Sequence, residues 1–453
     1  MHVKITGLPH HPTINGVDFS ELSTKEHKRI IRELSPRNYH QVKDWMVVGK
    51  GKREGTLLLQ RTLPDGMEEQ KEVFDCHAMY SACNFGHGDI FSDILKHCGL
   101  ENFWNHQVPA LPKSIDHKFQ APALTALKHL TGLDMFLLKS TGAEAVETAI
   151  NTSFKYVFIK RGRREVSKPI IIVPKNNFHG RTRLARSLSS SPLSREGFGP
   201  LLGGSVVRHT PYNCVSAIKE LVRRHRKNII AIVLEPVQGE GGVIVPSRDY
   251  LRQVAEICRE NDMVFILDEV QTGYGRTGSN FAYEQCGFLP DLLCGGKAAG
   301  AGIIPVSFVA GRRDIMESIE EGTEGATWSA TPIQCFALMS AIKALCDNNL
   351  SEESAQKGKY LHDLLKRLSE KYLDIITDVR GQGLFVVIET VFNGKAFSQA
   401  LLDLPQGAIW AKETGEDGKA IRISPPLTLP KEEIPKIVSS FEKVLLQFRD
   451  RHI

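Results

Sequence analysis

The sequence lacks the features that would tie it to a membrane or to an export route. None of its apolar runs approaches the roughly 20 residues that cross a bilayer as a helix. The N-terminal segment, MHVKITGLPHHP, has neither the apolar core of a signal peptide nor the arginine-rich character of a transit peptide. We therefore expect a soluble protein of the cytoplasm that does not contact a membrane.

Metal-ligand and disulfide patterns are also missing. The nine cysteines are odd in number, and they are scattered along the chain. None forms a C-x-x-C pair, and none has the spacing to histidine that zinc sites use. Reduced thiols are typical of the cytoplasm. We expect no metal site.

A strong charge imbalance is absent as well, since the formal net charge is only +5 over 453 residues. Two basic clusters, at 160–164 and 223–227, have the charge to contact phosphates, but solvated helix ends explain them better. No aromatic interleaving or nucleic-acid motif accompanies them. The sequence therefore gives no support for a nucleic-acid partner.

Strands and helices alternate from Gly132 onward, and the strands are apolar throughout. Such runs indicate a largely parallel sheet that helices cover on both faces, which is an α/β fold. Catalytic groups of such a sheet gather outside the carboxyl ends of its strands. The expected strands cover residues 135–140, 170–175, 231–235, 264–270, 292–296 and 305–311.

Chain length and a change in composition after Thr327 predict more than one domain. A helix near Ser351, a strand GLFVVIE, an edge segment AIRISPPL and a final amphipathic helix follow that change. We expect an N-terminal arm with part of a small domain at 1–72, a large domain at 73–347 and a C-terminal small domain at 348–453.

One lysine stands alone in the glycine-rich stretch LLCGGKAAGAG, residues 292–302. Lys297 has no carboxylate within four residues to pair with. Burial would depress its pKa and make it a nucleophilic amine, the form that builds a Schiff base. On its own, the stretch is explained better by an ordinary surface lysine on a flexible loop.

Two carboxylates, Asp268 and Glu269, end an otherwise apolar strand in LDEVQTGYGRTG. Burying a carboxylate costs several kcal/mol unless it is paired, and a protonated pyridine nitrogen would be a fitting partner. The three glycines that follow match a dinucleotide fingerprint formally, but the carboxylates would repel a pyrophosphate. The turn at 140–143 has free N–H groups at a helix start, as a phosphate cradle does.

Taken together, these segments resemble the class III pyridoxal-phosphate aminotransferases, and most closely their ornithine aminotransferase branch. The resemblance covers most of the chain, from Asn38 to Pro426. It implies the fold type I architecture, with a large domain and a small α+β domain built from both chain ends. The ten ordered matches are NYH at 38, YSACNFGH at 80, STGAEAVETA at 140, FHGRT at 178, EGFGP at 196, EPVQGEGG at 235, LDEVQTGYGRTG at 267, GGKAAGAG at 295, GATW at 325 and VRGQGL at 379.

The resemblance implies a role in binding pyridoxal 5'-phosphate for five residues near the strand ends. Lys297 would form a Schiff base with the cofactor and then move a proton at the substrate carbon. Asp268 would pair with the pyridinium nitrogen, which makes the ring an electron sink. Gln271 would donate a hydrogen bond to the phenolic oxygen, and Phe178 and Val270 would cover the two ring faces.

The resemblance also implies how the cofactor phosphate is held. Gly142 and Ala143 would donate backbone N–H groups to it. Thr327 looks like the residue that reaches the phosphate from the neighbouring subunit. A homodimer is therefore expected.

Five further residues match positions that bind the substrates in the family. Arg181 would clamp the α-carboxylate of the amino donor with its planar fork, beside Tyr39. Tyr80 matches a tyrosine that favours ornithine over 4-aminobutyrate. Glu240 would mask Arg422 while a terminal amine reacts, and then release it to bind the α-carboxylate of glutamate.

Four segments depart from the ornithine aminotransferase pattern. His179 stands where that branch carries tryptophan, and the loops after Glu240 and Lys297 are altered. The segment after Thr327 reads WSATP in place of a glycine-rich stretch. We expect these changes to border the substrate entrance and the dimer seam and to leave the cofactor chemistry untouched.

The activity that the resemblance implies is transfer of the terminal amine of ornithine, or of a similar diamino acid, to 2-oxoglutarate. The products would be a semialdehyde and glutamate. Transaminases for acetylornithine, lysine or 4-aminobutyrate, and an amino-acid racemase of the same fold, stay open as alternatives. A non-catalytic binding protein agrees poorly with the intact set of Lys297, Asp268 and Gln271.

Overall fold

The computed structural model describes residues 44–88, 115–199 and 206–452 continuously, together with residues 201–202. Shorter described pieces are 5–8, 11–14, 17–18, 20–35, 92, 96, 99, 103–104 and 107–111. Within these residues, no helix combines the length and the apolar character that crossing a membrane requires. Tyr39 lies outside them.

A seven-stranded sheet with the order β7-β13-β12-β11-β10-β8-β9 forms the centre of the large domain. All neighbours are parallel except β13, which runs antiparallel to both β12 and β7. The expected mostly parallel sheet is therefore confirmed, with one reversed strand. The strands are β7 (Met135–Lys139), β8 (Ile170–Pro174), β9 (Val207–Thr210), β10 (Ile229–Leu234), β11 (Val264–Asp268), β12 (Leu292–Gly295) and β13 (Ser307–Gly311).

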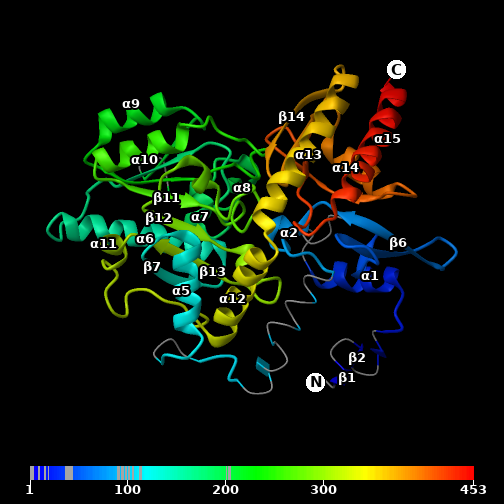
Figure 1. Ribbon diagram of the computed structural model, residues 1–453, viewed down its shortest axis with the longest axis horizontal. Helices are drawn as coiled ribbons and strands as arrows, with labels where there is room; N and C mark the ends of the chain where they lie inside the picture. Colours follow the sequence, from blue (N-terminus) through cyan, green and yellow to red (C-terminus); the bar gives the residue numbers. More distant parts are fainter. Residues whose placement is uncertain are drawn as a thin grey trace.

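Helices cover both faces of this sheet (Figure 1). Successive residues of a strand point to opposite faces, so Ile232 packs in one apolar core and Val233 in the other. Helices α5, α9, α10 and α12 contribute to the first core, and α6, α7 and α11 to the second. The helices are α5 (Gln120–Thr131), α6 (Gly142–Lys160), α7 (Arg183–Leu188), α8 (Pro192–Arg195), α9 (Val215–His225), α10 (Tyr250–Glu260), α11 (Arg313–Met316) and α12 (Pro332–Asp347), with the 3-10 turns η2 (Ala282–Cys286) and η3 (Lys297–Gly300).

The C-terminal part of the chain forms a second sheet, with the order β14-β15-β18-β17 and antiparallel neighbours. Helices α13, α14 and α15 lie beside it (Figure 1). On the last helix, which the sequence predicted to be amphipathic, the apolar residues Ile434, Phe441 and Val444 are buried. The elements are α13 (Leu350–Lys371), β14 (Ile376–Gln382), β15 (Phe385–Thr390), α14 (Gly394–Asp403), β16 (Ile409–Trp410), β17 (Lys412–Thr414), β18 (Ala420–Ile423), η4 (Lys431–Glu433) and α15 (Ile434–His452).

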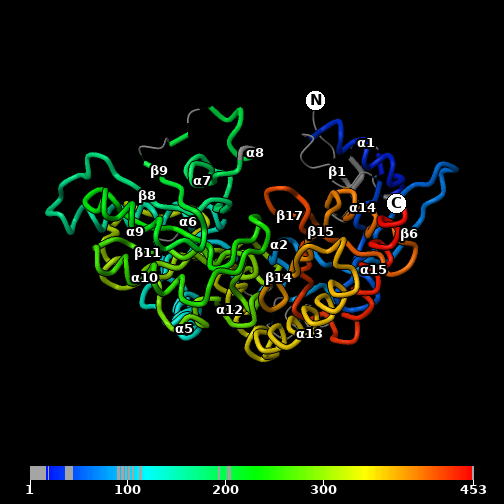
Figure 2. Tube along the Cα trace, turned by 90° about the horizontal axis from the view of Figure 1, so that it is seen from above, coloured from blue at the N-terminus to red at the C-terminus, as the bar shows by residue number. Residues whose placement is uncertain are grey.

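The two ends of the chain meet in the small domain, as Figure 2 shows from above. The short strand β16 pairs in parallel with β6, through Ile409 and Phe74, and so joins the N-terminal sheet β16-β6-β5-β4. The small α+β domain expected from both chain ends is thereby confirmed. The N-terminal elements are β1 (Ile5–Leu8), β2 (His11–Ile14), β3 (Val17–Asp18), α1 (Thr24–Leu34), β4 (Met46–Lys50), β5 (Thr56–Thr62), β6 (Glu68–Asp75) and α2 (Ala78–Ser81).

Candidate active site

Lys297 lies just past the carboxyl end of β12, beside the carboxyl end of the parallel strand β11. In the register of these strands Cys294 pairs with Asp268, and Lys297 follows as the first residue of η3. The residue keeps some solvent access. Burial nevertheless lowers the pKa of Lys297 to about 8, against the opposing charges of Asp268 and Glu240. A lysine that loses its proton this readily can act as a nucleophile, whereas a surface lysine would not.

Asp268 ends β11 and is 5% exposed. Its Oδ2 lies 2.7 Å from Nδ1 of His179, and its Oδ1 accepts a 3.0 Å hydrogen bond from the N–H of Val270. Asn177 turns its amide oxygen to the other ring nitrogen of His179, at 2.8 Å. Burial opposes the charged imidazole, but the hydrogen bond to Asp268, its charge and that of Glu235 raise the pKa of His179. The hydrogen bond from His179 thus fixes the position of the Asp268 carboxyl group.

Two other buried carboxylates hold loops together. Glu269 accepts hydrogen bonds from the N–H groups of Ala282 and Tyr283, at 2.8 and 2.9 Å. Glu235 accepts from the N–H groups of Phe178 and Gly239, at 2.9 and 3.0 Å. Of the two carboxylates that end β11, only Asp268 is therefore directed toward the candidate site.

The N-terminus of α6 packs closely against the loops that carry Val270 and Phe178. A Cβ atom on Gly142 would lie 2.7 Å from Cγ1 of Val270. A Cβ atom on Gly180 would lie equally close, at 2.7 Å, to the Cβ of Ala143. Glycine is thus required at both positions, because no side chain fits between these elements.

Two backbone donors at the start of α6 remain free. The side chain of Thr141 accepts from the N–H of Glu144, whose carboxylate accepts from the N–H of Thr141. This capping box leaves the N–H groups of Gly142 and Ala143 without a hydrogen-bond partner among the described residues. Free N–H groups at the positive end of a helix favour an anion such as a phosphate.

Gln271 presents a third unused donor. Its side chain is 7% exposed, and within the described part of the chain its Nε2 has no hydrogen-bond partner. Unpaired buried donors are rare in folded proteins because they cost free energy. A bound group with an acceptor oxygen would satisfy this one.

Glu240 and Arg422 form an ion pair across the two domains, with 2.7 Å between Oε1 and Nη1. Arg422 is 1% exposed, and its Nε and Nη2 have no partner among the described residues. Burial opposes the charge of Glu240, but Arg422, with Lys412 and Lys297, lowers the pKa of its carboxyl group. The guanidinium therefore keeps two donors for a carboxylate.

Tyr80 approaches this ion pair from a strained turn. Four consecutive residues, from Ala78 to Ser81, have φ between 41° and 72°, and none is glycine. Residues other than glycine adopt this left-handed region only at a cost. Asp75 stabilises the turn by accepting from the N–H groups of His77 and Ala78. The Tyr80 ring centre comes to lie 4.9 Å from Cζ of Arg422.

Comparison with known proteins identifies the family. The model of the family described as Aminotransferase class-III matches residues 63–445. The chain belongs to the class III aminotransferases. It is therefore a pyridoxal-phosphate-dependent aminotransferase of fold type I, as the sequence predicted.

Relatives and solved structures support this assignment over nearly the whole chain. The ornithine aminotransferase of Geobacillus sp. (strain WCH70) is 34% identical over 424 residues, which are 93% of this chain and 98% of that protein. A crystal structure of the ornithine aminotransferase from Toxoplasma gondii ME49 superposes with a TM-score of 0.83 at 28% identity, covering 95% of this chain and 97% of that one. The acetylornithine aminotransferase from Elizabethkingia anophelis has a TM-score of 0.77 at 28% identity, with 94% and 100% covered.

One expectation about this aminotransferase is wrong. His179 does not border the substrate entrance, because its ring is 3% exposed and hydrogen-bonded to Asp268. The two residues are 89 positions apart in the chain. Only the order of strands in the sheet brings them together, and Asn177 was missed for the same reason.

Three expected site residues lie at the edge of the candidate site or outside the described residues. Arg181 is exposed, with its guanidinium carbon 5.7 Å from the centre of the Phe178 ring. Thr327 is also exposed, and the neighbouring carbonyl of Trp328 accepts a 3.5 Å hydrogen bond from Ser140. Tyr39 lies outside the described residues.

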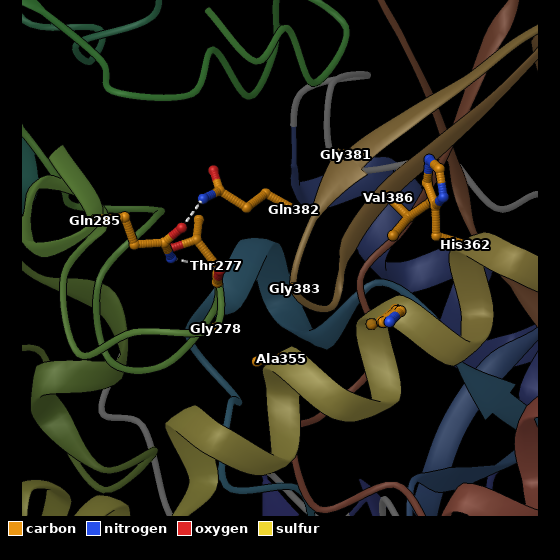
Figure 3. Close-up of a pocket in the computed structure, with 11 residues that line it drawn as sticks. Thr277, Gly278, Gln285, Ala355, His362, Gly381, Gln382, Gly383 and Val386 are labelled. Atoms are coloured by element: carbon orange, nitrogen blue, oxygen red, sulfur yellow. Dashed lines mark hydrogen bonds between the residues drawn. The ribbon is translucent and has the colours of Figure 1, made fainter. Parts of the chain in front are cut away.

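A pocket of about 300 Å³ lies elsewhere, between the loop after β11, helix α13 and the β14–β15 hairpin (Figure 3). None of the predicted site residues lines it. Gln382 donates a hydrogen bond to Gln285 across it, and the backbone of Gly383 approaches Thr277 so closely that a Cβ atom would lie 2.5 Å away. This pocket lies where the two domains pack against each other, and its lining is distinct from the site around Lys297.

Proposed function

We propose that this aminotransferase moves the terminal amino group of ornithine, or of a similar diamino acid, to 2-oxoglutarate, giving a semialdehyde and glutamate. The observation that carries the proposal is the Glu240–Arg422 pair with its two unused donors. A terminal amine brings no carboxylate next to its reacting carbon, whereas glutamate does. A guanidinium that a carboxylate can mask or release suits both substrates, because neither leaves the Arg422 guanidinium unpaired.

The residues at the strand ends fit pyridoxal 5'-phosphate. When bound, the cofactor supplies an aldehyde that condenses with amines and a protonated ring that withdraws electrons. Lys297 would hold the aldehyde, and Asp268, fixed by His179, would hold the proton on the ring nitrogen. The free donor of Gln271 would be satisfied by the phenolic oxygen, and the N–H groups of Gly142 and Ala143 by the phosphate.

Lys297 would also carry the proton that transamination moves. As a free amine with a pKa lowered to about 8, Lys297 would be partly unprotonated near neutral pH. An amine of this pKa can accept a proton from the substrate carbon that bears the amino group and return it later. Phe178 and Val270 would cover the ring and exclude water from that carbon.

The remaining substrate contacts follow from position. Arg181, at the exposed edge beside Phe178, would bind the α-carboxylate of the diamino acid with its planar fork. Tyr39 is proposed to stand beside it. Tyr80, against Arg422, would favour ornithine over 4-aminobutyrate.

We also propose a homodimer in which the exposed Thr327 reaches the phosphate site of the neighbouring subunit. The boundaries 1–72, 73–347 and 348–453 are the proposed domain limits. A cytoplasmic location agrees with the eight described cysteines, which are all free thiols.

A donor screen tests the proposed substrate. The holoenzyme is incubated with 2-oxoglutarate and with ornithine, N-acetylornithine, lysine or 4-aminobutyrate, and glutamate is measured. We expect the highest kcat/KM with ornithine. A higher value with another donor would reassign the substrate, and a reaction of the amino acid that needs no 2-oxoglutarate would point to a racemase.

A further inference from the structure

Lys412 is a second cation in the pocket of Arg422. The two residues are direct partners on the antiparallel strands β17 and β18, so their side chains leave the sheet on the same face. Both touch Tyr80: Nζ of Lys412, like Cζ of Arg422, is 4.9 Å from the centre of its ring. The ammonium group of Lys412 also donates a hydrogen bond to the Tyr80 hydroxyl. Figure 2 shows β17 beside α2, the turn that carries Tyr80.

The backbone of Glu240 is anchored to the same hairpin. Its carbonyl accepts hydrogen bonds from the N–H of Gly415, at 3.2 Å, and from the hydroxyl of Thr414, at 3.1 Å. The side chain is 32% exposed, so part of it is surrounded by solvent into which it can rotate. Glu240 can therefore change its ionic partner by side-chain rotation alone. Its backbone stays bonded to Thr414, which lies two residues after Lys412 in the chain.

The proposed exchange, in which Arg422 leaves Glu240 for a substrate carboxylate, removes the ion-pair partner of Glu240. When Arg422 turns to a substrate carboxylate, the Glu240 carboxylate loses its partner, and a partly buried charge without a partner is costly. Among the described residues, Arg422, Lys412 and Lys297 are the cations that act most strongly on Glu240. Lys297 is needed for the proposed Schiff base and proton transfer. Lys412 is therefore the cation that can pair with the released Glu240 carboxylate.

We propose that Lys412 is a positioning residue that receives the Glu240 carboxylate when Arg422 is released, and so sets how readily the site accepts the α-carboxylate of glutamate. The inference rests on the proposed function, in which Glu240 and Arg422 separate once in each catalytic cycle. Lys412 acts through Glu240 and does not touch the reacting atoms.

The glutamate half-reaction of the holoenzyme measures this role directly. Single turnover of the cofactor is followed by its absorbance in the wild type, in Lys412→Met, in Lys412→Arg and in the control Lys419→Met. Lys419 lies exposed in the turn of the same hairpin. We expect Lys412→Met to lower kcat/KM for glutamate by about tenfold, the size of a coupled charge pair. Lys412→Arg should keep most of the activity, and the control all of it.

A double-mutant cycle separates this role from two others. In a Glu240→Ala background Lys412→Met should have little further effect, because no carboxylate is left to receive. An undiminished loss in that background would show that Lys412 binds the substrate carboxylate itself. Tyr80→Phe removes the hydroxyl that Lys412 bonds but keeps the charge of Lys412. If this variant shows the same loss of kcat/KM for glutamate as Lys412→Met, the role of Lys412 is only to hold Tyr80. Either result overturns the proposal.

The half-reaction also distinguishes failure of the inference from failure of the proposed function. A wild-type holoenzyme that does not react with glutamate at all would refute the proposed acceptor and its switch. A wild type that reacts normally, with an equally active Lys412→Met variant, would refute the role of Lys412 alone.

Discussion

At the scale of the residue, the site depends on a few ionisable side chains whose pKa values the fold shifts by burial and by neighbouring charges. Lys297 is held in a conformation with φ of 50° at the start of η3, beside the carboxylate of Asp268. Burial makes its ammonium form unfavourable, although Asp268 and Glu240 compensate in part. The same environment that activates the amine therefore costs folding free energy when the amine is charged.

This cost predicts a pH-dependent effect of Lys297→Met on the cofactor-free protein. The pKa falls from 10.5 in the unfolded chain to about 8 in the fold, so between these values the unfolded state binds more protons and stability rises with pH. Below pH 8 the penalty is complete. Lys297→Met should raise the free energy of unfolding there, and the gain should shrink as pH approaches 10.5.

Urea unfolding of both proteins across this pH range provides the measurement. The value at the alkaline end serves as the internal control, because both side chains are then uncharged. A gain that is constant across the range would mean that Lys297 is not desolvated in the fold.

At the scale of the element, the start of helix α6 forms one wall of the proposed cofactor site. Its capping box fixes the first turn, and close packing against Val270 fixes its distance from β11. The motif at residues 140–143 predicted a phosphate cradle, and the structure adds the reason for glycine at position 142. Val270 is β-branched and stiff, so it cannot move aside for a methyl group.

Gly142→Ala should therefore weaken cofactor binding. The added methyl group would overlap Val270, which lies 2.7 Å from it, and would push α6 away from the ring site. We expect the dissociation constant of pyridoxal 5'-phosphate to rise by about tenfold, the range that overpacking costs. Titration of the cofactor-free protein, followed by absorbance, gives this value.

Gly49→Ala is the matched control, because a Cβ atom on Gly49 meets no atom within 4 Å. Its affinity for the cofactor should equal that of the wild type. Unchanged affinity for the cofactor in Gly142→Ala would show that Val270 or helix α6 can shift to accommodate the added methyl group.

At the scale of the whole molecule, buried polar contacts join the two domains around the site. Arg276, on the loop after β11, is fully buried and donates to the carbonyls of Leu384 and Pro425 and to the side chain of Asn84. Burial lowers its pKa to about 9. Because Arg422 belongs to the small domain and Glu240 to the large one, this fixed contact preserves the alignment of the substrate pair.

The sequence predicted the parts of this arrangement that local pattern encodes. Apolar runs revealed the sheet, and the end of each run located residues such as Lys297 and Asp268. The pairing of His179 with Asp268 could not be predicted, because it depends on the strand order, in which only β10 separates β8 from β11. The left-handed turn at 78–81 also escaped, since its residues include no glycine, and its conformation is imposed by contacts such as those to Asp75.

The central claim is that the cofactor is bound through the amine of Lys297. Borohydride reduction of the holoenzyme fixes the cofactor to whichever amine holds it, and mass spectrometry of the digested protein then locates the label. We predict that the label is found on Lys297 alone. A label on another lysine, or a bound cofactor that reduction does not attach to the protein, would contradict it.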